Sequence, residues 1–228
     1  MENKDSIIRM FNVSKRYGKK HAVKDISLDI AAGEFIFVTG PSGAGKSTLM
    51  KLIYLAERAT QGQILIDGMN IDRISYDRVP FLRRRIGVIF QDFKLIPNRS
   101  VFANVALVLE AAGVKQLTIK NRVMTVLKTM GIADKANAFP PSLSGGEQQR
   151  VAIARAVVGN PRIILADEPT GSLDNRSAQM VLDYLMQYND RGATILIASH
   201  NIQLISSTVR ARSISLVDGV LAGTARML

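Results

Sequence analysis

Gly40-Pro-Ser-Gly-Ala-Gly-Lys46-Ser47 is the most informative segment of this 228-residue chain, and it closely follows the short apolar run Glu34–Val38. Glycines let successive backbone N–H groups face one centre, and a helix that begins after the loop adds its positive N-terminal end. Lys46 can then reach the outer phosphates of a nucleotide, while the Ser47 hydroxyl can bind Mg²⁺. The pattern predicts a phosphate-binding loop between a buried strand and a helix over about residues 47–56.

Two more short apolar runs share this layout and end in polar residues: Ile163–Ala166 before Asp167 and Glu168, and Ala193–Ala198 before Ser199 and His200. Each run is too short for an ordinary helix, so strands are predicted. Open α/β sheets bind ligands at the carboxyl ends of their strands. The three polar strand ends are therefore predicted to meet around one ligand.

The rest of the chain alternates strand-like and helix-like segments, which favours an α/β fold with a largely parallel sheet. Residues 92–159 differ in being helical, with Val123, Val126, Leu127 and Met130 at the spacing of an amphipathic helix. The chain before the glycine loop, with Gln63–Asp67 and Arg85–Phe90, is predicted to form a small antiparallel β flap. We expect one domain over 1–228, with core and flap in about 1–91 and 160–228 and a helical subdomain in about 92–159.

Composition narrows the class of protein. The chain has no cysteine, which excludes disulfides and thiol nucleophiles. Its charged first residues lack the apolar segment of a secretory signal. Hydropathy gives no run near the roughly 18 apolar residues that a membrane-spanning helix needs. We therefore expect a soluble or peripheral protein.

The charge is strongly basic, with 30 Lys and Arg against 19 Asp and Glu. A solvated basic surface is one interpretation, and attraction to an anionic membrane surface is another, with Arg83-Arg84-Arg85 as its best local candidate. Nucleic-acid binding is the third, but no stripe of basic and aromatic residues supports it. We expect no nucleic-acid partner, although charge by itself does not decide.

Leu143-Ser-Gly-Gly-Glu147-Gln-Gln-Arg150 is a second glycine-rich helix start. Ser144 and Glu147 have the spacing of a capping box, and an apolar face follows at Val151, Ile153, Ala154 and Val157. Capping explains the helix but not two glycines in its first turn, each of which costs about 1 kcal/mol relative to alanine. Because free N–H groups at a helix N-terminus bind anions, we predict a second phosphate contact here.

The two glycine-rich segments together resemble the nucleotide-binding subunit of ABC transporters. The resemblance covers the chain from about Met10 to Gly219, and its most specific part is Leu143–Arg150. It implies a P-loop (RecA-like) core, an Mg²⁺-dependent ATPase, and a homodimer that holds ATP between two copies of the chain.

The resemblance also implies a role for each matching residue. On one copy it places ATP at Tyr17, which stacks on adenine, and at Gly40, Pro41, Ser42, Gly43, Ala44, Gly45, Lys46, Ser47 and Thr48. From the opposing copy it adds Ser144, Gly145, Gly146 and Asp174, the last in the loop Ser172-Leu173-Asp174. It places Mg²⁺ at Ser47, Gln91 and Asp167. The expected catalytic residues are Lys46, Gln91, Glu168 as general base and His200 at the γ-phosphate. Asn201 departs from the family, where many members carry an acidic residue.

Within the family, Lys51–Tyr54 and Phe81–Phe93 resemble the cell-division branch, whose ATPases work with a polytopic membrane protein of the FtsX type. This implies a peripheral protein at the cytoplasmic face of the bacterial inner membrane that regulates cell-wall hydrolysis. A lipoprotein-releasing or macrolide-exporter ATPase is the alternative. Two other classes fit less well. An ATPase acting on nucleic acid would usually carry a second cassette or a coiled-coil insertion, and neither is found. A scaffold that binds nucleotide without turnover is disfavoured by the presence of Glu168 and His200.

The family's membrane subunit is expected to dock between the sheet core and the helical insertion. The candidate contacts on this chain are Phe93, Leu95, Ile96 and Phe102. Packing inside the insertion is an equally open interpretation of these four side chains.

Overall fold

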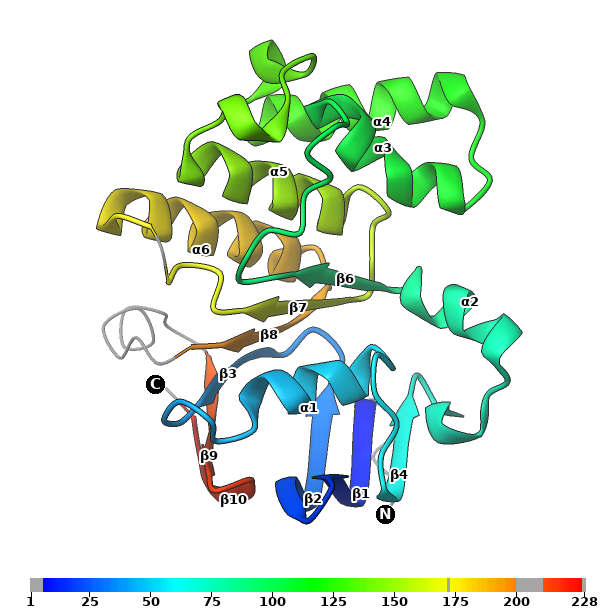
Figure 1. The fold of residues 1–228 in the computed structure, drawn as a ribbon, viewed down its shortest axis with the longest axis vertical. Coiled ribbons are helices and arrows are strands. Elements are labelled where there is room, and N and C mark those ends of the chain that lie inside the picture. The colour runs from blue at the N-terminus through cyan, green and yellow to red at the C-terminus, as the bar shows by residue number, and fades with distance from the viewer. Residues whose placement is uncertain (1–5, 172, 200–210, 227–228) are drawn as a thin grey trace.

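The computed structural model describes residues 6–171, 173–199 and 211–226. Its central sheet has the strand order β10-β9-β3-β8-β7-β6 (Figure 1). The strands are β3 (Phe35–Thr39), β6 (Ile86–Ile89), β7 (Ile163–Asp167), β8 (Thr194–Ala198), β9 (Arg212–Val217) and β10 (Val220–Arg226). All neighbours pair in parallel except β9 and β10. The predicted α/β class with a mostly parallel sheet is confirmed.

A second sheet forms the antiparallel flap, in the order β2-β1-β4-β5. Its strands are β1 (Ser6–Tyr17), β2 (Lys20–Ala31), β4 (Gln61–Ile66) and β5 (Met69–Asn70). The prediction that Arg85–Phe90 belongs to this flap is wrong, because β6 pairs in parallel with β7 in the central sheet. The segment Ile86–Ile89 is a continuous apolar run, which is typical of a strand buried on both faces of a parallel sheet. Gly87 permits the packing, since a Cβ there would lie 2.4 Å from the Ala156 carbonyl oxygen.

Six α-helices complete the described part of the chain: α1 (Lys46–Ile53), α2 (Val79–Arg83), α3 (Val101–Ala111), α4 (Gln116–Thr129), α5 (Gly145–Val157) and α6 (Asn175–Asp190). Short 3₁₀ turns lie at Ile71–Arg73, Tyr76–Arg78, Ala133–Lys135 and Pro140–Ser142. Helices α3, α4 and α5 stand together above the edge of the sheet formed by β6 (Figure 1). The amphipathic pattern in α4 is confirmed, because Val123, Leu127 and Met130 are buried and Val126 packs against the same core.

The central sheet separates two hydrophobic cores. Phe35 and Phe37 of β3 join a core with helices α3–α6, whereas Ile36 and Val38 join the other with α1 and the flap. This division follows from the two-residue period of a strand, which sends alternate side chains to opposite faces. Both faces of β3 are therefore anchored, and its carboxyl end is a rigid base for the loop that follows.

Candidate active site

The glycine loop occupies the connection between β3 and α1. Gly45 precedes the helix with φ of 101°, and a Cβ there would lie 2.4 Å from the Ala22 carbonyl oxygen of β2. Any other residue would be both strained and too close. Helix α1 has no side-chain hydrogen bond at its N-cap. Its first backbone N–H groups are therefore oriented as in an anion-binding helix start.

Lys46 is the buried cation of this loop, with only 8% of its surface exposed. Its Nζ donates to the carbonyl oxygens of Gly40 at 2.8 Å and Pro41 at 3.1 Å, and lies 3.9 Å from Oε1 of Glu168. The ammonium is thereby held between the loop and the end of β7. A phosphate placed over the loop would meet a positive charge that is already desolvated and oriented.

Ser47 and Asp167 form a polar pair beside the lysine. The Ser47 hydroxyl donates to Oδ1 of Asp167 at 3.1 Å. Burial raises the pKa of the Asp167 carboxyl, and the charge of Glu168 raises it further, against the opposing effects of Ser47 and Lys46. A partly buried carboxylate next to a hydroxyl is an oxygen pair that suits a hard cation such as Mg²⁺.

No group of three or more His, Asp or Glu side chains gathers to hold a metal in the described part of the chain. Mg²⁺ commonly binds through one or two protein oxygens together with substrate phosphates. Ser47 and Asp167 therefore fit a cation that arrives with a phosphate ligand.

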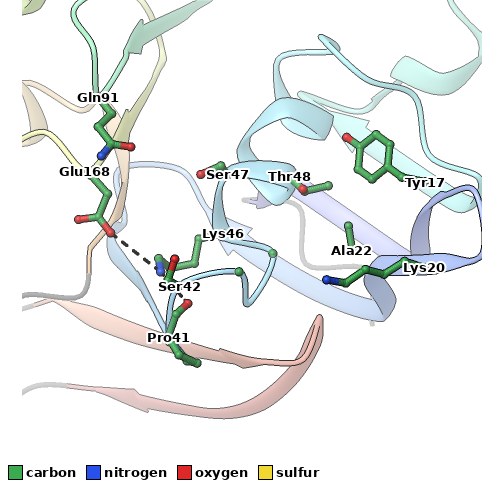
Figure 2. A pocket seen from close by; sticks show the side chains of 12 residues that line it. Tyr17, Lys20, Ala22, Pro41, Ser42, Lys46, Ser47, Thr48, Gln91 and Glu168 are labelled. Atoms are coloured by element: carbon green, nitrogen blue, oxygen red, sulfur yellow. Dashed lines mark hydrogen bonds and ion pairs between the residues drawn. The ribbon is translucent and has the colours of Figure 1, made fainter.

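Glu168 follows Asp167 directly and has an unusual backbone. Its φ is 47°, in the left-handed region, and its N–H donates to the Ala198 carbonyl oxygen of β8 at 2.9 Å. Non-glycine residues in this conformation cost on the order of 1–3 kcal/mol and occur often at functional sites. The strain turns the carboxyl group toward Lys46 rather than along the strand (Figure 2).

Lys46, Ser47 and Glu168 line a cavity of about 670 Å³, whereas Asp167 lies outside its lining. The other lining residues are Tyr17, Lys20, Ala22, Pro41, Ser42, Gly43, Gly45, Thr48 and Gln91 (Figure 2). Tyr17, 45% exposed, stands at the opposite end of the cavity from Glu168, and the ammonium of Lys15 lies 5.1 Å from its ring centre. The cavity thus has an aromatic end and a charged end that carries the glycine loop. This is the arrangement that a nucleoside triphosphate requires.

The structure brings most of the predicted nucleotide residues together. Among the ATP contacts predicted on one copy, Tyr17 and residues 40–48, only Gly40 and Ala44 do not line the cavity. The Gly40 carbonyl oxygen accepts a hydrogen bond from the Lys46 ammonium, and Ala44 is buried. The predicted contacts from a second copy do not line it either: Ser144, Gly145, Gly146 and Asp174. Ser172, His200 and Asn201 lie outside the described residues.

Comparison with known proteins agrees with this geometry. Residues 23–171 match the family described as "ABC transporter". The chain belongs to the ABC transporter family.

Individual relatives of this ABC protein extend the match to nearly its full length. It is 48% identical to the cell division ATP-binding protein FtsE of Bacillus subtilis over 94% of both chains. It is also 48% identical to FtsE of Escherichia coli strain K12, over 95% of this chain and 98% of that protein. A solved dimeric ATP-binding cassette bound to ADP and Pi superimposes with a TM-score of 0.90 at 35% identity, covering 97% and 99% of the two chains. The chain is therefore an ATP-hydrolysing ABC subunit of the FtsE-like type.

The cavity also contains two residues of this ABC ATPase that the motifs do not indicate, Lys20 and Ala22. Both belong to β2, which pairs with β1 through Tyr17 and Lys20 on either side of a two-residue turn. Gly18 in that turn has φ of 58°. A glycine at the first turn position is typical of tight hairpins, and it is the signal that could have placed Lys20 beside Tyr17.

The start of α5 has the capping box that its sequence predicts. The Ser144 hydroxyl accepts from the Glu147 N–H at 3.3 Å, and the Ser144 N–H donates to the Glu147 carboxylate at 2.8 Å. That backbone hydrogen bond lowers the pKa of Glu147. Asp174 likewise caps α6 by accepting from the N–H of Ser177 at 2.9 Å. Both helix starts are preorganised within a single chain.

Asp167→Asn is expected to raise the melting temperature of the nucleotide-free chain at pH 7. The pKa of Asp167 is higher in the folded chain than its ordinary 3.8, so the folded state binds this proton more tightly. Folding stability then falls as pH rises from that ordinary value through the raised one, and at pH 7 the carboxylate opposes folding. Thermal unfolding of both proteins at pH 7 and below pH 4 measures the effect. The difference should shrink at the acid end, and a lower melting temperature for Asp167→Asn at pH 7 would contradict it.

Proposed function

We propose that this FtsE-like ABC ATPase closes as a homodimer around two Mg²⁺-ATP molecules, and that hydrolysis drives a polytopic membrane partner of the FtsX type. In this proposal, Ser144, Gly145, Gly146 and Asp174 of one copy complete the cavity of the other. The chain acts at the cytoplasmic face of the bacterial inner membrane, where the partner carries the motion to cell-wall hydrolysis during division.

The observation that carries the shared site is the unexplained glycine at the start of α5. Gly145 has no positive φ, and a Cβ added there would meet nothing within 4 Å. The chain's own fold therefore does not need glycine here, although glycine in a helix costs about 1 kcal/mol relative to alanine. The glycine is explained if an anion from outside the chain approaches the start of α5 closely. The related cassette solved with ADP and Pi is dimeric, which supports the same reading.

The chain's own groups divide the work of phosphoryl transfer. Lys46 neutralises charge on the outer phosphates, because its ammonium already points across the loop. Glu168 accepts a proton from the attacking water and is held toward Lys46 by its backbone. Ser47 and Asp167 would hold Mg²⁺, which supplies Lewis-acid stabilisation of the phosphate oxygens when bound. Gln91, which lines the same cavity, is proposed to orient the water, and His200 to hold the γ-phosphate.

Tyr17→Ala is expected to raise the KM for ATP by about 5- to 100-fold, with a much smaller change in kcat, because stacking on a base is worth about 1–3 kcal/mol. Tyr17→Trp should remain near the parent value, since it keeps an aromatic face. Steady-state ATPase assays across ATP concentrations measure both constants. Tyr76→Ala removes an 83% exposed tyrosine outside the cavity and is the matched control. Equal effects of the two alanine variants would count against an adenine site at Tyr17.

A second cavity supports a docking place for the membrane partner. It has about 350 Å³ and lies between the sheet core and the helical insertion, with β6 and the residues that follow α1 on one side and residues of α3 and α5 on the other. None of the four contacts suggested by sequence lines it. Leu95 and Phe102 instead pack against the hydrophobic core. We propose that the partner contacts Tyr54, Val108 and Gly159, which do line this groove.

The basic run Arg83–Arg85 is exposed, and its side chains also bond within the protein. Arg83 donates to the Leu55 carbonyl oxygen at 3.0 Å, Arg84 to that of Ala111 at 2.5 Å, and Arg85 to Asp67 at 3.2 Å. None of the described helices is long and apolar enough to cross a membrane. We propose that the peripheral location rests on the docking of the membrane partner.

Co-purification from membranes tests the partner. The tagged chain should retain a polytopic protein of the FtsX type, identified by mass spectrometry, and its ATPase rate should respond to that protein. Gly159→Phe, which fills the groove, should abolish retention without changing ATP binding. Gly223→Phe is the control, because this glycine of β10 does not line the groove and a Cβ there meets nothing within 4 Å, while a Cβ at Gly159 meets the Val108 side chain at an ordinary 3.4 Å. Retention of no polytopic protein, or stimulation by duplex DNA instead, would refute the proposal.

A further inference from the structure

Arg155 of α5 forms an internal connection to the loop that follows β6. Its Nη1 donates to the Lys94 carbonyl oxygen at 2.6 Å and its Nη2 to that of Phe93 at 2.5 Å. The residue is 9% exposed, and burial lowers the pKa of its guanidinium. A guanidinium stays protonated in proteins, so this buried charge depends on the acceptors that it reaches. A planar fork matches two adjacent carbonyl groups as a point charge does not.

The loop that Arg155 holds has an unusual backbone at the same two residues. Phe93 has φ of 58° and Lys94 has φ of 49°, both in the left-handed region. Two bulky residues in succession rarely adopt this conformation unless the surroundings hold them there. Carbonyl groups turned toward one guanidinium provide such a restraint.

A second buried side chain holds the far end of the loop. Asn104 of α3, with no exposed surface, accepts from the Ile96 N–H at 2.8 Å and donates to the Ile96 and Arg99 carbonyl oxygens at 3.1 and 2.9 Å. The segment after Gln91 is therefore bound to α5 at one place and to α3 at another. Gln91 itself lies two residues before Phe93 and lines the nucleotide cavity (Figure 2).

We propose that Arg155 is a positioning residue that holds Gln91 in the nucleotide cavity through the Phe93 and Lys94 carbonyl groups. The proposal rests on the proposed role of Gln91 in hydrolysis. Arg155 also lines the groove assigned to the membrane partner. A partner segment in that groove would reach this connection directly, so occupancy of the groove and the position of Gln91 are linked by one side chain.

Amide hydrogen exchange tests the connection without any turnover. In the nucleotide-free chain, Arg155→Lys and Arg155→Met should speed exchange in the peptide 91–97 by about tenfold or more. Arg155→Lys retains a charge and guards against a variant that fails to fold. The control is Arg212→Met, which removes a half-buried arginine with bonds to Asp29 and Glu34, away from this loop. Unchanged exchange in 91–97 overturns the proposal, whatever the ATPase rate.

A double-mutant cycle tests whether the connection acts through Gln91. Arg155→Lys should lower kcat by about tenfold while KM for ATP changes little, because only the water-orienting side of the cavity is disturbed. In a Gln91→Ala background the same substitution should have no further effect on kcat. If the fold losses in kcat from the two substitutions multiply in the double variant, Arg155 acts independently of Gln91. If the parent chain does not hydrolyse ATP at all, the proposed function fails, while the exchange result still decides whether Arg155 holds the loop.

Discussion

Glu168→Gln is expected to lower kcat for ATP hydrolysis by about 10²- to 10⁴-fold, the range that one general base contributes. The amide has the same shape as the carboxylate but cannot accept the proton of the attacking water. Binding should survive, because the glycine loop and the Gly40 and Pro41 carbonyl groups that hold Lys46 are unchanged. Single-turnover and steady-state phosphate-release assays measure the loss, and nucleotide titration measures the retained affinity.

The same substitution should trap the ATP-bound dimer, since closure is no longer followed by hydrolysis. Light scattering with Mg²⁺-ATP should give twice the monomer mass for Glu168→Gln. Glu110→Gln is the control, because Glu110 pairs with Arg99 at 3.8 Å and does not line the cavity. Turnover at the parent rate in Glu168→Gln would remove this residue from the mechanism.

Lys46→Met is expected to weaken ATP binding by about 10²- to 10³-fold, which corresponds to losing one or two charge-assisted hydrogen bonds worth about 1.5–3 kcal/mol each. The methionine fills similar space, so the change removes mainly the charge. Its effect is large because the ammonium is buried and already aimed by the Gly40 and Pro41 carbonyl groups. Equilibrium binding of a fluorescent ATP analogue gives the two dissociation constants.

Lys20→Met is the matched control for that experiment, since Lys20 lines the same cavity from an exposed position on β2. Exposed charges are screened by water and contribute little, so its effect should stay below about 1 kcal/mol. Comparable losses from the two substitutions would mean that net charge, rather than the glycine loop, governs binding.

The parts of the site that are formed by residues close together along the chain were predicted from the sequence. A glycine loop after a buried strand fixes Lys46 and Ser47 near the phosphates, and Glu168 follows another strand end within the same parallel sheet. The sheet assignment of β6 failed because a four-residue apolar run does not show which strand it pairs with. Lys20 was missed because the hairpin register, not a motif, places it in the cavity.

Long-range contacts could not be predicted from the sequence either. Leu95 and Phe102 have the same apolar character whether they face a partner or a core, and only the packing of α3 against its neighbours decides. The connection from Arg155 to the Phe93 and Lys94 carbonyls spans some 60 residues and carries no pattern in the sequence.

Thiol crosslinking is the most direct measurement of the shared ATP site, because the chain has no cysteine of its own. Ser42→Cys and Ser144→Cys are combined in the Glu168→Gln background, with each single-cysteine variant as a control. With Mg²⁺-ATP, a short bifunctional thiol reagent should join Ser42→Cys of one copy to Ser144→Cys of another and give a covalent dimer. A crosslink confined to one chain, or no ATP-dependent crosslink between chains, would contradict the account.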